Sequence, residues 1–303
     1  MRIAVIADIH GNVPALEAVL DHLVGRAVDE VLVGGDLVGR GPEGGRVVQR
    51  IGELGFPTIG GNHEEYLLDF RHGRVPAEWD TAEEWDAARW MAAELSDDDV
   101  RAIESLPFSL NRPGMRLVHG TPSSNRDGIG PWTGDALLRR HWDEVPETLL
   151  VCAHTHRPLV RRVPNGLVVN VGSVGLPFNG DHAAQYAIFE RPSDAPEGAW
   201  KVEPQRVPYD LGRTFAAYER TGFLAAGGIT ARLLRHELEH ATPLLVPFLE
   251  WARRRGVTPA SDRLDEFFTF HRPGESLRHF FERLHALEGQ VQSPRTGPAS
   301  GDP

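Results

Sequence analysis

Residues 2–12 read RIAVIADIHGN, an apolar run followed by two polar side chains and a turn. The run Arg2–Ala7 predicts a strand that is buried on both faces. Asn12 is a suitable N-cap, and the residues after it repeat their apolar positions at helical spacing. Asp8 and His10 are therefore expected at the carboxyl end of a buried strand, which is where open α/β sheets bind ligands.

Four further short apolar runs also end in Asp, Asn or His beside a polar or glycine-containing turn. These ends carry Gly35-Asp36, Asn62-His63-Glu64, His119-Gly120 and His154-Thr155-His156. If the ends share one edge of a sheet, their nitrogen and oxygen donors gather in one place. Such a mixed donor set suits Mn, Fe, Zn or Co better than Ca or Mg. The pattern predicts a site that can hold two metal ions.

Strands and helices alternate along the first part of the chain. A strand at Glu30–Val33, a helix at Val47–Leu54 and a short strand at Pro57–Ile59 are expected after the first strand–helix pair. This order predicts βαβ units with parallel strands. Further strands are expected at Met115–His119, Thr148–Ala153, Leu167–Val171 and Gln185–Phe189, the last two in a second layer rich in hairpins.

Two regions interrupt or extend this pattern. Residues 76–106 predict a helical insertion that contains Trp79, Trp85 and Trp90. It either lies beside or over the site, where its aromatic rings could stack on a nucleobase, or it forms ordinary core helices. We expect a domain of residues 1–210, a helical extension of residues 211–289 and a disordered tail of residues 290–303. Within the extension, helices are predicted at Phe215–Glu219, Ala231–Arg255 and Leu264–Leu287.

Composition and charge limit the class of protein. The 303 residues have a formal net charge of −11, which does not favour a nucleic-acid-binding surface. The single cysteine, Cys152, excludes an internal disulfide framework and is typical of a reducing compartment. No apolar stretch is long enough to span a membrane. The sequence predicts a cytoplasmic protein that binds neither nucleic acid nor membrane, and it does not indicate an oligomeric state.

The motifs D-x-H, GDLVGRG, GNHE, VHG and H-x-H occur in this order between residues 8 and 156. Together they resemble the calcineurin-like metallophosphoesterase superfamily. The segment DIHGN and the later Gly172-Ser173-Val174-Gly175 are similar to its branch of small bacterial and archaeal phosphoesterases. The resemblance implies an α/β fold, a four-layer α/β/β/α sandwich, and extends from Asp8 to about Asp181.

The resemblance also implies a role for each motif residue. One metal ion is expected to bind Asp8, His10, Asp36 and His156, and the other to bind Asp36, Asn62, His119 and His154. His63 would contact the phosphate or protonate the leaving oxygen, and Arg40 would hold a phosphoryl oxygen. For His63 a supporting role is the alternative, and for Arg40 a surface ion pair. The protein-phosphatase branch has a second Asp in GDxxDRG, and this chain has Gly39 there.

The expected activity is hydrolysis of a phosphomonoester by a hydroxide that bridges the metal ions. The substrate would be a small phosphorylated molecule or a nucleotide, and Mn is the first expectation, with Fe, Zn, Co or Ni as alternatives. Cleavage of phosphodiesters, such as cyclic nucleotides or dinucleoside polyphosphates, is the second possibility. A metal-binding regulatory protein without turnover is the third.

One motif points elsewhere. His236-Glu237-Leu238-Glu239-His240 fits H-E-x-x-H, the helix motif of zinc proteases. No third ligand stands out downstream, and the chain has 14 histidines. A solvated helix face is therefore the preferred interpretation.

Overall fold

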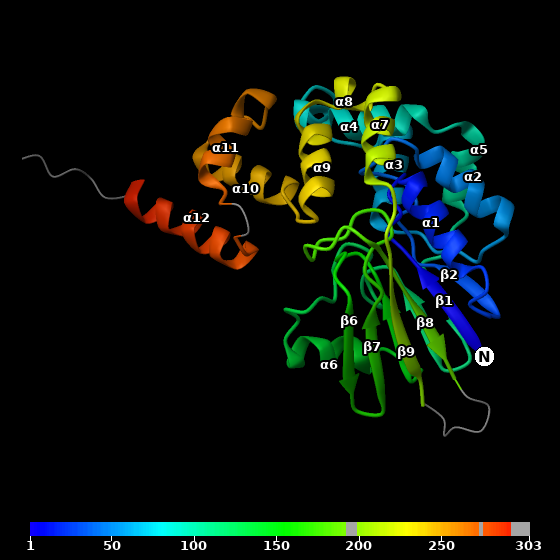
Figure 1. Ribbon diagram of the computed structural model, residues 1–303. Coiled ribbons are helices and arrows are strands. Elements are labelled where there is room, and N and C mark those ends of the chain that lie inside the picture. Colours follow the sequence, from blue (N-terminus) through cyan, green and yellow to red (C-terminus); the bar gives the residue numbers. More distant parts are fainter. Residues whose placement is uncertain (192–198, 273–274, 292–303) are drawn as a thin grey trace, which may run out of the picture. The chain divides into compact units, whose positions relative to one another are not determined.

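The computed structural model describes residues 1–191, 199–272 and 275–291 (Figure 1). The chain divides into two compact units, Met1–Thr242 and Pro243–Pro303. The helices between residues 211 and 240, which the sequence analysis assigned to the extension, thus belong to the first unit. The predicted tail lies outside the described residues, except for Gln290 and Val291 at the end of the last helix.

Two β-sheets form the centre of the first unit. One sheet has the order β2 (Glu30–Val33), β1 (Arg2–Ile6), β8 (Ala184–Glu190), β9 (Lys201–Val207). The other has the order β3 (Ser109–Arg112), β4 (Met115–Val118), β5 (Leu149–Cys152), β7 (Gly166–Asn170), β6 (Leu159–Val163). Strand β1 is parallel to β2, and β5 is parallel to both β4 and β7. The predicted parallel arrangement is confirmed for these pairs.

Apolar side chains from both sheets form one shared core. Val5 and Leu32 of the first sheet pack in it with Leu117, Val151 and Val169 of the second. On its other face the second sheet packs against the side of α6 (Asp135–Asp143). Helix α1 (Val13–Leu23) contacts β8 and β9 of the first sheet. The predicted four-layer α/β/β/α sandwich is confirmed.

Helix α3 (Asn62–Arg71) precedes the segment predicted as an insertion, residues 76–106. That segment is helical, as predicted, and contains η1 (Ala77–Asp80), η2 (Glu83–Trp85), α4 (Asp86–Glu94) and α5 (Asp97–Glu104). Helix α4 packs on α3 and on α9 (Gly228–His240). Trp79 stacks on Trp85 with ring centroids 3.7 Å apart, and Trp90 contacts Phe223. These contacts favour the interpretation that the tryptophans are packing residues.

Several predicted elements differ from those observed. Pro57–Ile59 forms no strand and makes only an isolated parallel bridge from Thr58 to Val33. The prediction that β7 and β8 share a layer is wrong, because they belong to different sheets. Each does pair antiparallel with a neighbour in sequence, β7 with β6 and β8 with β9. Strands β3, β6 and β9 and helix α6 were not predicted, since their apolar residues do not alternate clearly.

The second unit begins with a break that the sequence analysis missed. The predicted helix Ala231–Arg255 is two helices, α9 and α10 (Leu245–Arg255). Ala241 has φ of 47°, and Pro243 follows, which together end α9. The predicted helix Leu264–Leu287 is likewise two helices, α11 (Leu264–Phe270) and α12 (Leu277–Val291). Arg272 precedes a proline in the sequence, and that position disfavours helix.

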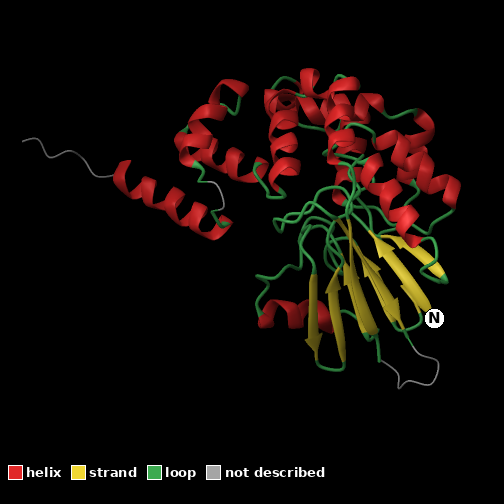
Figure 2. Cartoon of the chain, in the orientation of Figure 1, coloured by secondary structure: helices red, strands yellow, loops and turns green. Residues whose placement is uncertain are grey.

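The remaining elements are short or lie around the strand ends. They are α2 (Gly44–Leu54), α7 (Leu211–Arg220), α8 (Phe223–Ala226) and η3 (Ser261–Arg263). Figure 2 shows the loops of the first unit gathered at one end of the strands, on the side of its helices. Among the described residues, no helix combines the length and apolar character needed to cross a membrane.

Candidate metal centre

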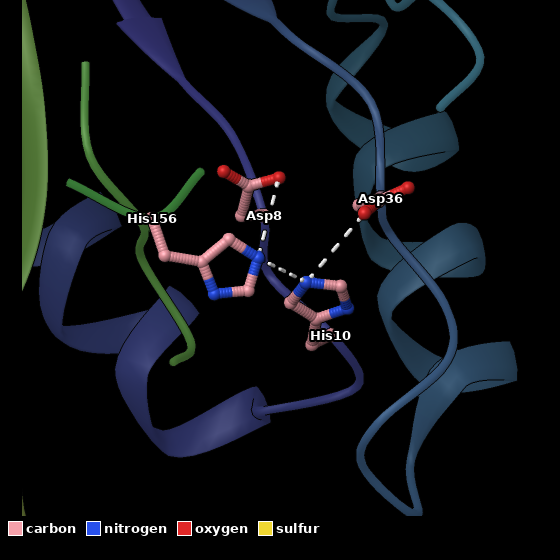
Figure 3. Close-up of side chains that lie close together, drawn as sticks. All are labelled: Asp8, His10, Asp36 and His156. Carbon is pink, nitrogen blue, oxygen red and sulfur yellow. Dashed lines mark hydrogen bonds and ion pairs between the residues drawn. The ribbon is translucent and has the colours of Figure 1, made fainter. Parts of the chain in front are cut away.

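The loops at the strand ends bring all seven predicted metal ligands together. Donor atoms of Asp8, His10, Asp36 and His156 lie within 4.8 Å of one another (Figure 3). Asp36, His119 and His154 form a second such group, so Asp36 belongs to both. The Oδ1 atom of Asn62 lies 2.9 Å from His119 Nε2 and 2.8 Å from His154 Nδ1. The seven side chains named from the sequence thus lie together, and their role as metal ligands stays a prediction.

The hydrogen bonds of His10 and His156 show which ring nitrogens are available. His10 Nδ1 lies 3.2 Å from the Val38 carbonyl, and His156 Nδ1 lies 2.6 Å from the Leu176 carbonyl. Because a carbonyl only accepts, each neutral ring has its proton on Nδ1 and a lone pair on Nε2. The two Nε2 atoms are 3.0 Å apart. Two lone pairs at this distance repel unless a cation or a proton lies beside them, so the pair fits a metal ion.

A buried carboxylate oxygen supports the same conclusion. Asp8 Oδ1 has no hydrogen-bond partner, and it lies 3.9 Å from His156 Nε2. Asp36 Oδ2 lies 3.6 Å from His10 Nε2 and 3.4 Å from His119 Nε2. An unpaired buried carboxylate oxygen is costly unless a cation compensates it. These donors therefore suit a divalent metal ion.

Backbone strain is concentrated at this place. Among the described residues, nine other than glycine have positive φ, and six of them are Asp8, His10, Asp36, Arg40, His154 and His156. A non-glycine residue in this region costs roughly 1–3 kcal/mol. Such strain persists where the surrounding structure fixes the backbone, as it does around binding and catalytic groups.

Glu64 fixes the loop that carries Asp36, a role that the sequence analysis did not assign. Its buried carboxylate accepts hydrogen bonds from four backbone N–H groups, those of Asp36, Leu37, Val38 and Gly61, at 2.7–3.2 Å. Glu64 stands at the third position of α3, and an acidic residue there is a recognised signal for a bond to the N-cap. That signal in the GNHE motif could have identified it.

Gly61 is required by the approach of Asp36. A Cβ atom at residue 61 would lie 2.2 Å from Asp36 Oδ1 and 2.7 Å from its backbone nitrogen. Asp36 Oδ1 also accepts a hydrogen bond of 2.9 Å from the His63 backbone N–H. The glycine therefore lets the shared carboxylate sit against the start of α3.

Burial and charge set the protonation of the cluster. Burial lowers the pKa of His10 and of His154 to about 4, and it lowers that of His156 well below its ordinary value. These rings are neutral at pH 7 and can act as ligands. Burial also acts to lower the pKa of His119, but the carboxylates of Asp36 and Asp8 outweigh it and raise this pKa to about 10. Burial raises the pKa of Asp8 well above its ordinary value.

Metal loading is therefore expected to release protons. Below pH 10 the metal-free site holds a proton on His119, and ligation of Nε2 displaces it. We expect release of about one proton per protein at pH 7.5, the one that His119 carries. Calorimetric titration of chelator-treated protein with Mn²⁺, in buffers of different ionisation enthalpy, measures this number. A heat of binding that is the same in every buffer would contradict the prediction.

Arg40 and His63 lie next to the cluster without belonging to it. The His63 ring centroid is 5.0 Å from that of His10, and Arg40 Nε donates to His63 Nε2 at 3.1 Å. Arg40 Nη1 also donates to Glu237 Oε2 at 3.1 Å. The Arg40 side chain is 16% exposed and that of Glu237 only 1%. Arg40 therefore forms an ion pair, as the alternative expected, but with a buried carboxylate and not at the surface.

The residues of the zinc-protease motif have different partners. Glu237 is directed to Arg40, whereas His236, Glu239 and His240 form a more exposed group whose donor atoms lie within 4.8 Å of one another. Glu239 is 45% exposed and lies 3.4 Å from His236 Nδ1. The glutamate of the motif is thus held by an arginine, which does not suit a general base of a zinc protease.

Comparison with known proteins identifies the family of this chain and structures with a similar fold. Residues 1–194 match the calcineurin-like phosphoesterase superfamily domain. An uncharacterized protein of Methanocaldococcus jannaschii is 28% identical over 239 residues, which make up 72% of this chain and 90% of that protein.

Two solved structures are similar to this chain. A metallophosphoesterase from Sphaerobacter thermophilus has a TM-score of 0.64 and 28% identity, over 80% of this chain and 100% of that one. A hypothetical protein from Pyrococcus horikoshii OT3 has a TM-score of 0.65 and 23% identity, over 80% of this chain and 99% of that one. The second likeness shows the fold.

Proposed function

The chain belongs to the calcineurin-like phosphoesterase superfamily, and from this we propose that it is a phosphoesterase that uses two divalent metal ions. The observation that carries the proposal is the pair of donor groups that share Asp36. A single shared carboxylate between two sets of imidazole and oxygen donors is suited to two neighbouring cations. The lone pairs that face each other at His10 and His156 support metal ligation further.

We assign the ligands as the resemblance implied. Asp8, His10, Asp36 and His156 would hold one ion, and Asp36, Asn62, His119 and His154 the other. When bound, the two ions would supply a nucleophile from water near neutral pH and neutralise charge on the phosphoryl oxygens. Imidazole, carboxylate and amide donors together favour a transition metal, with Mn as the first choice and Fe, Zn, Co or Ni as alternatives.

The residues beside the ions would act on the substrate. His63 is the second residue of α3, its backbone N–H donates to Asp36 Oδ1, and its ring centroid lies 5.0 Å from that of His10. Arg40 keeps a guanidinium charge beside that ring. We propose that both contact the phosphoryl group, since a guanidinium pairs well with phosphate oxygens. Burial and Arg40 lower the pKa of His63 well below its ordinary value, so donation of a proton requires that the phosphoryl charge stabilise its imidazolium.

Small phosphorylated molecules or nucleotides are the proposed substrates, and phosphomonoesters come first. The experiment that tests this is hydrolysis of nitrophenyl phosphate and of bis-nitrophenyl phosphate by protein loaded with each metal. Faster hydrolysis of the monoester supports a phosphatase, and faster hydrolysis of the diester supports the alternative of a phosphodiesterase. Metal binding without turnover of either ester, or of a nucleotide panel, would support a regulatory protein.

Replacement of His63 separates catalysis from metal binding. His63→Ala is expected to lower kcat by about 10²–10⁴-fold, because a positioned acid or phosphate contact is lost. The metal content should remain two ions per protein, since His63 lies in neither donor group. Activity assays together with elemental analysis check both outcomes. Loss of one ion on this substitution would place His63 among the ligands instead.

A further inference from the structure

Helix α9 carries a buried carboxylate, that of Glu237, which lies beside Arg40 next to the candidate metal centre. Glu237 is 1% exposed, and its Oε2 accepts a hydrogen bond of 3.1 Å from Arg40 Nη1. Helix α9 lies beyond residues 1–194, which match the family. A buried carboxylate and a guanidinium compensate each other's charge, so separating the two side chains would be unfavourable.

Arg40 connects this carboxylate to His63. Its Nε donates to His63 Nε2 at 3.1 Å, while its Nη1 faces Glu237. Its backbone is strained, with φ of 60°, and the Tyr218 hydroxyl of α7 donates to its carbonyl at 2.7 Å. Both the main chain and the side chain of Arg40 are thus held by helices α7 and α9.

The His63 ring lies so close to Gly39 that residue 39 cannot carry an acidic side chain. Gly39 has φ of 77°, and a Cβ atom there would lie 2.4 Å from His63 Nδ1. The imidazole therefore lies against the glycine, and no acidic side chain fits at this position. On its other edge the ring meets Arg40, whose counter-charge is Glu237.

We propose that Glu237 is a positioning residue of the phosphoesterase site. It holds the Arg40 guanidinium against His63, and Arg40 in turn orients the imidazole beside the metal ligands. The expected change in kcat rests on the proposed function. The expected orientation of His63 rests only on the hydrogen bonds between Glu237, Arg40 and His63.

The first test replaces the charge but keeps the shape. Glu237→Gln is expected to lower kcat by about 10–100-fold, because a hydrogen bond between charged groups is weakened. The matched control is Glu239→Gln on the same helix, whose carboxylate is 45% exposed and pairs with Arg235 and His236. The control should keep wild-type kcat, and both variants should keep two metal ions. Glu237→Gln removes one charge of a buried pair, so a lower Tm is expected for it and kcat is compared well below that Tm. A loss of metal in Glu237→Gln alone, or a kcat equal to that of the control, would overturn the proposal.

A double-mutant cycle tests the route through Arg40. Arg40→Ala leaves Glu237 buried without its counter-charge and can destabilise the fold, so the double variant Arg40→Ala with Glu237→Gln removes both charges. In the Arg40→Ala background, Glu237→Gln should cause no further loss of kcat. Where Arg40→Ala does not fold, the double variant should match the kcat of Arg40→Gln. If the factors by which the two single substitutions lower kcat multiply in the double variant, Glu237 acts independently of Arg40 and the proposal is overturned.

A spectroscopic readout keeps this inference separate from the proposed activity. The ring nitrogens of His63 are observed by NMR in zinc-loaded protein labelled with ¹⁵N-histidine, and His63→Ala assigns them. Glu237→Gln should shift the His63 Nε2 resonance, and Glu239→Gln should not. An unshifted resonance overturns the positioning role even if the enzyme is active. If wild-type protein hydrolyses no phosphoester but the shift is seen, the proposed function fails and the positioning of His63 stands.

Discussion

Asp36→Asn is expected to lower phosphoesterase activity by about 10³-fold or more and to release metal from both positions. Asp36 is the one residue shared by the two donor groups, so the substitution removes negative charge from both at once. It also weakens the acceptor for the His63 N–H, which positions the start of α3. Kinetics with nitrophenyl phosphate and elemental analysis of the dialysed protein measure the two effects.

A buried aspartate outside the centre provides the control. Asp99 is also buried, and it bonds the Ser96 backbone at the start of α5. Asp99→Asn should change stability modestly through the helix cap and leave metal content and kcat near wild type. If Asp36→Asn keeps two ions and near-normal turnover, the assignment of a shared bridging carboxylate is wrong.

The order of the motifs carried most of the information about the site. Each ligand follows a short buried strand or opens a helix, and strands that run parallel end at the same edge. For this reason local patterns at residues 8, 36, 119 and 154 were sufficient to predict that side chains far apart in the chain would meet. The approach of His10 Nε2 to His156 Nε2 at 3.0 Å, and of His119 Nε2 to Asn62 Oδ1 at 2.9 Å, agrees with that expectation.

The parts that the sequence did not reveal depend on contacts between distant segments. No local pattern links Glu237 to Arg40, because their approach requires α9 to pack beside the loop that follows β2. The same holds for Tyr218, and for Thr214, whose hydroxyl donates to Asn12 Oδ1 at 2.9 Å. The sequence analysis gave the region after residue 210 no role, whereas the structure places three of its side chains against the loops of the site.

The errors in secondary structure have two causes. Pro57–Ile59 reads as a strand, yet Thr58 makes only one bridge. The apolar spacing of Ala231–Arg255 continues across residues 241–243, so periodicity alone joined α9 and α10. Strand β6 carries Arg161 and Arg162 and pairs only with β7, which hides the alternation expected of a strand. For the two strands tertiary pairing decided what a weak local preference left open, whereas the break between α9 and α10 comes from the local signal of Ala241 and Pro243.

Glu64→Ala should have the largest effect on folding. The side chain is buried and is the common acceptor for four backbone N–H groups, so its removal leaves buried donors without a partner. We expect the free energy of unfolding to fall by about 3–5 kcal/mol. The loop that carries Asp36 should loosen as well, and metal affinity should fall with it. Chemical denaturation and a metal titration on the same samples measure both.

The neighbouring residue separates this role from a general effect of charge on α3. Glu65 is 43% exposed and pairs with Arg126 at 3.2 Å, so Glu65→Ala should change the free energy of unfolding by less than about 1 kcal/mol. Glu64→Gln keeps the shape and one acceptor oxygen, and it should fall between the two alanine variants. Equal stability of Glu64→Ala and Glu65→Ala would mean that water replaces the carboxylate without cost. In that event the Asp36 loop would be held by the strained backbone and by Gly61, not by Glu64.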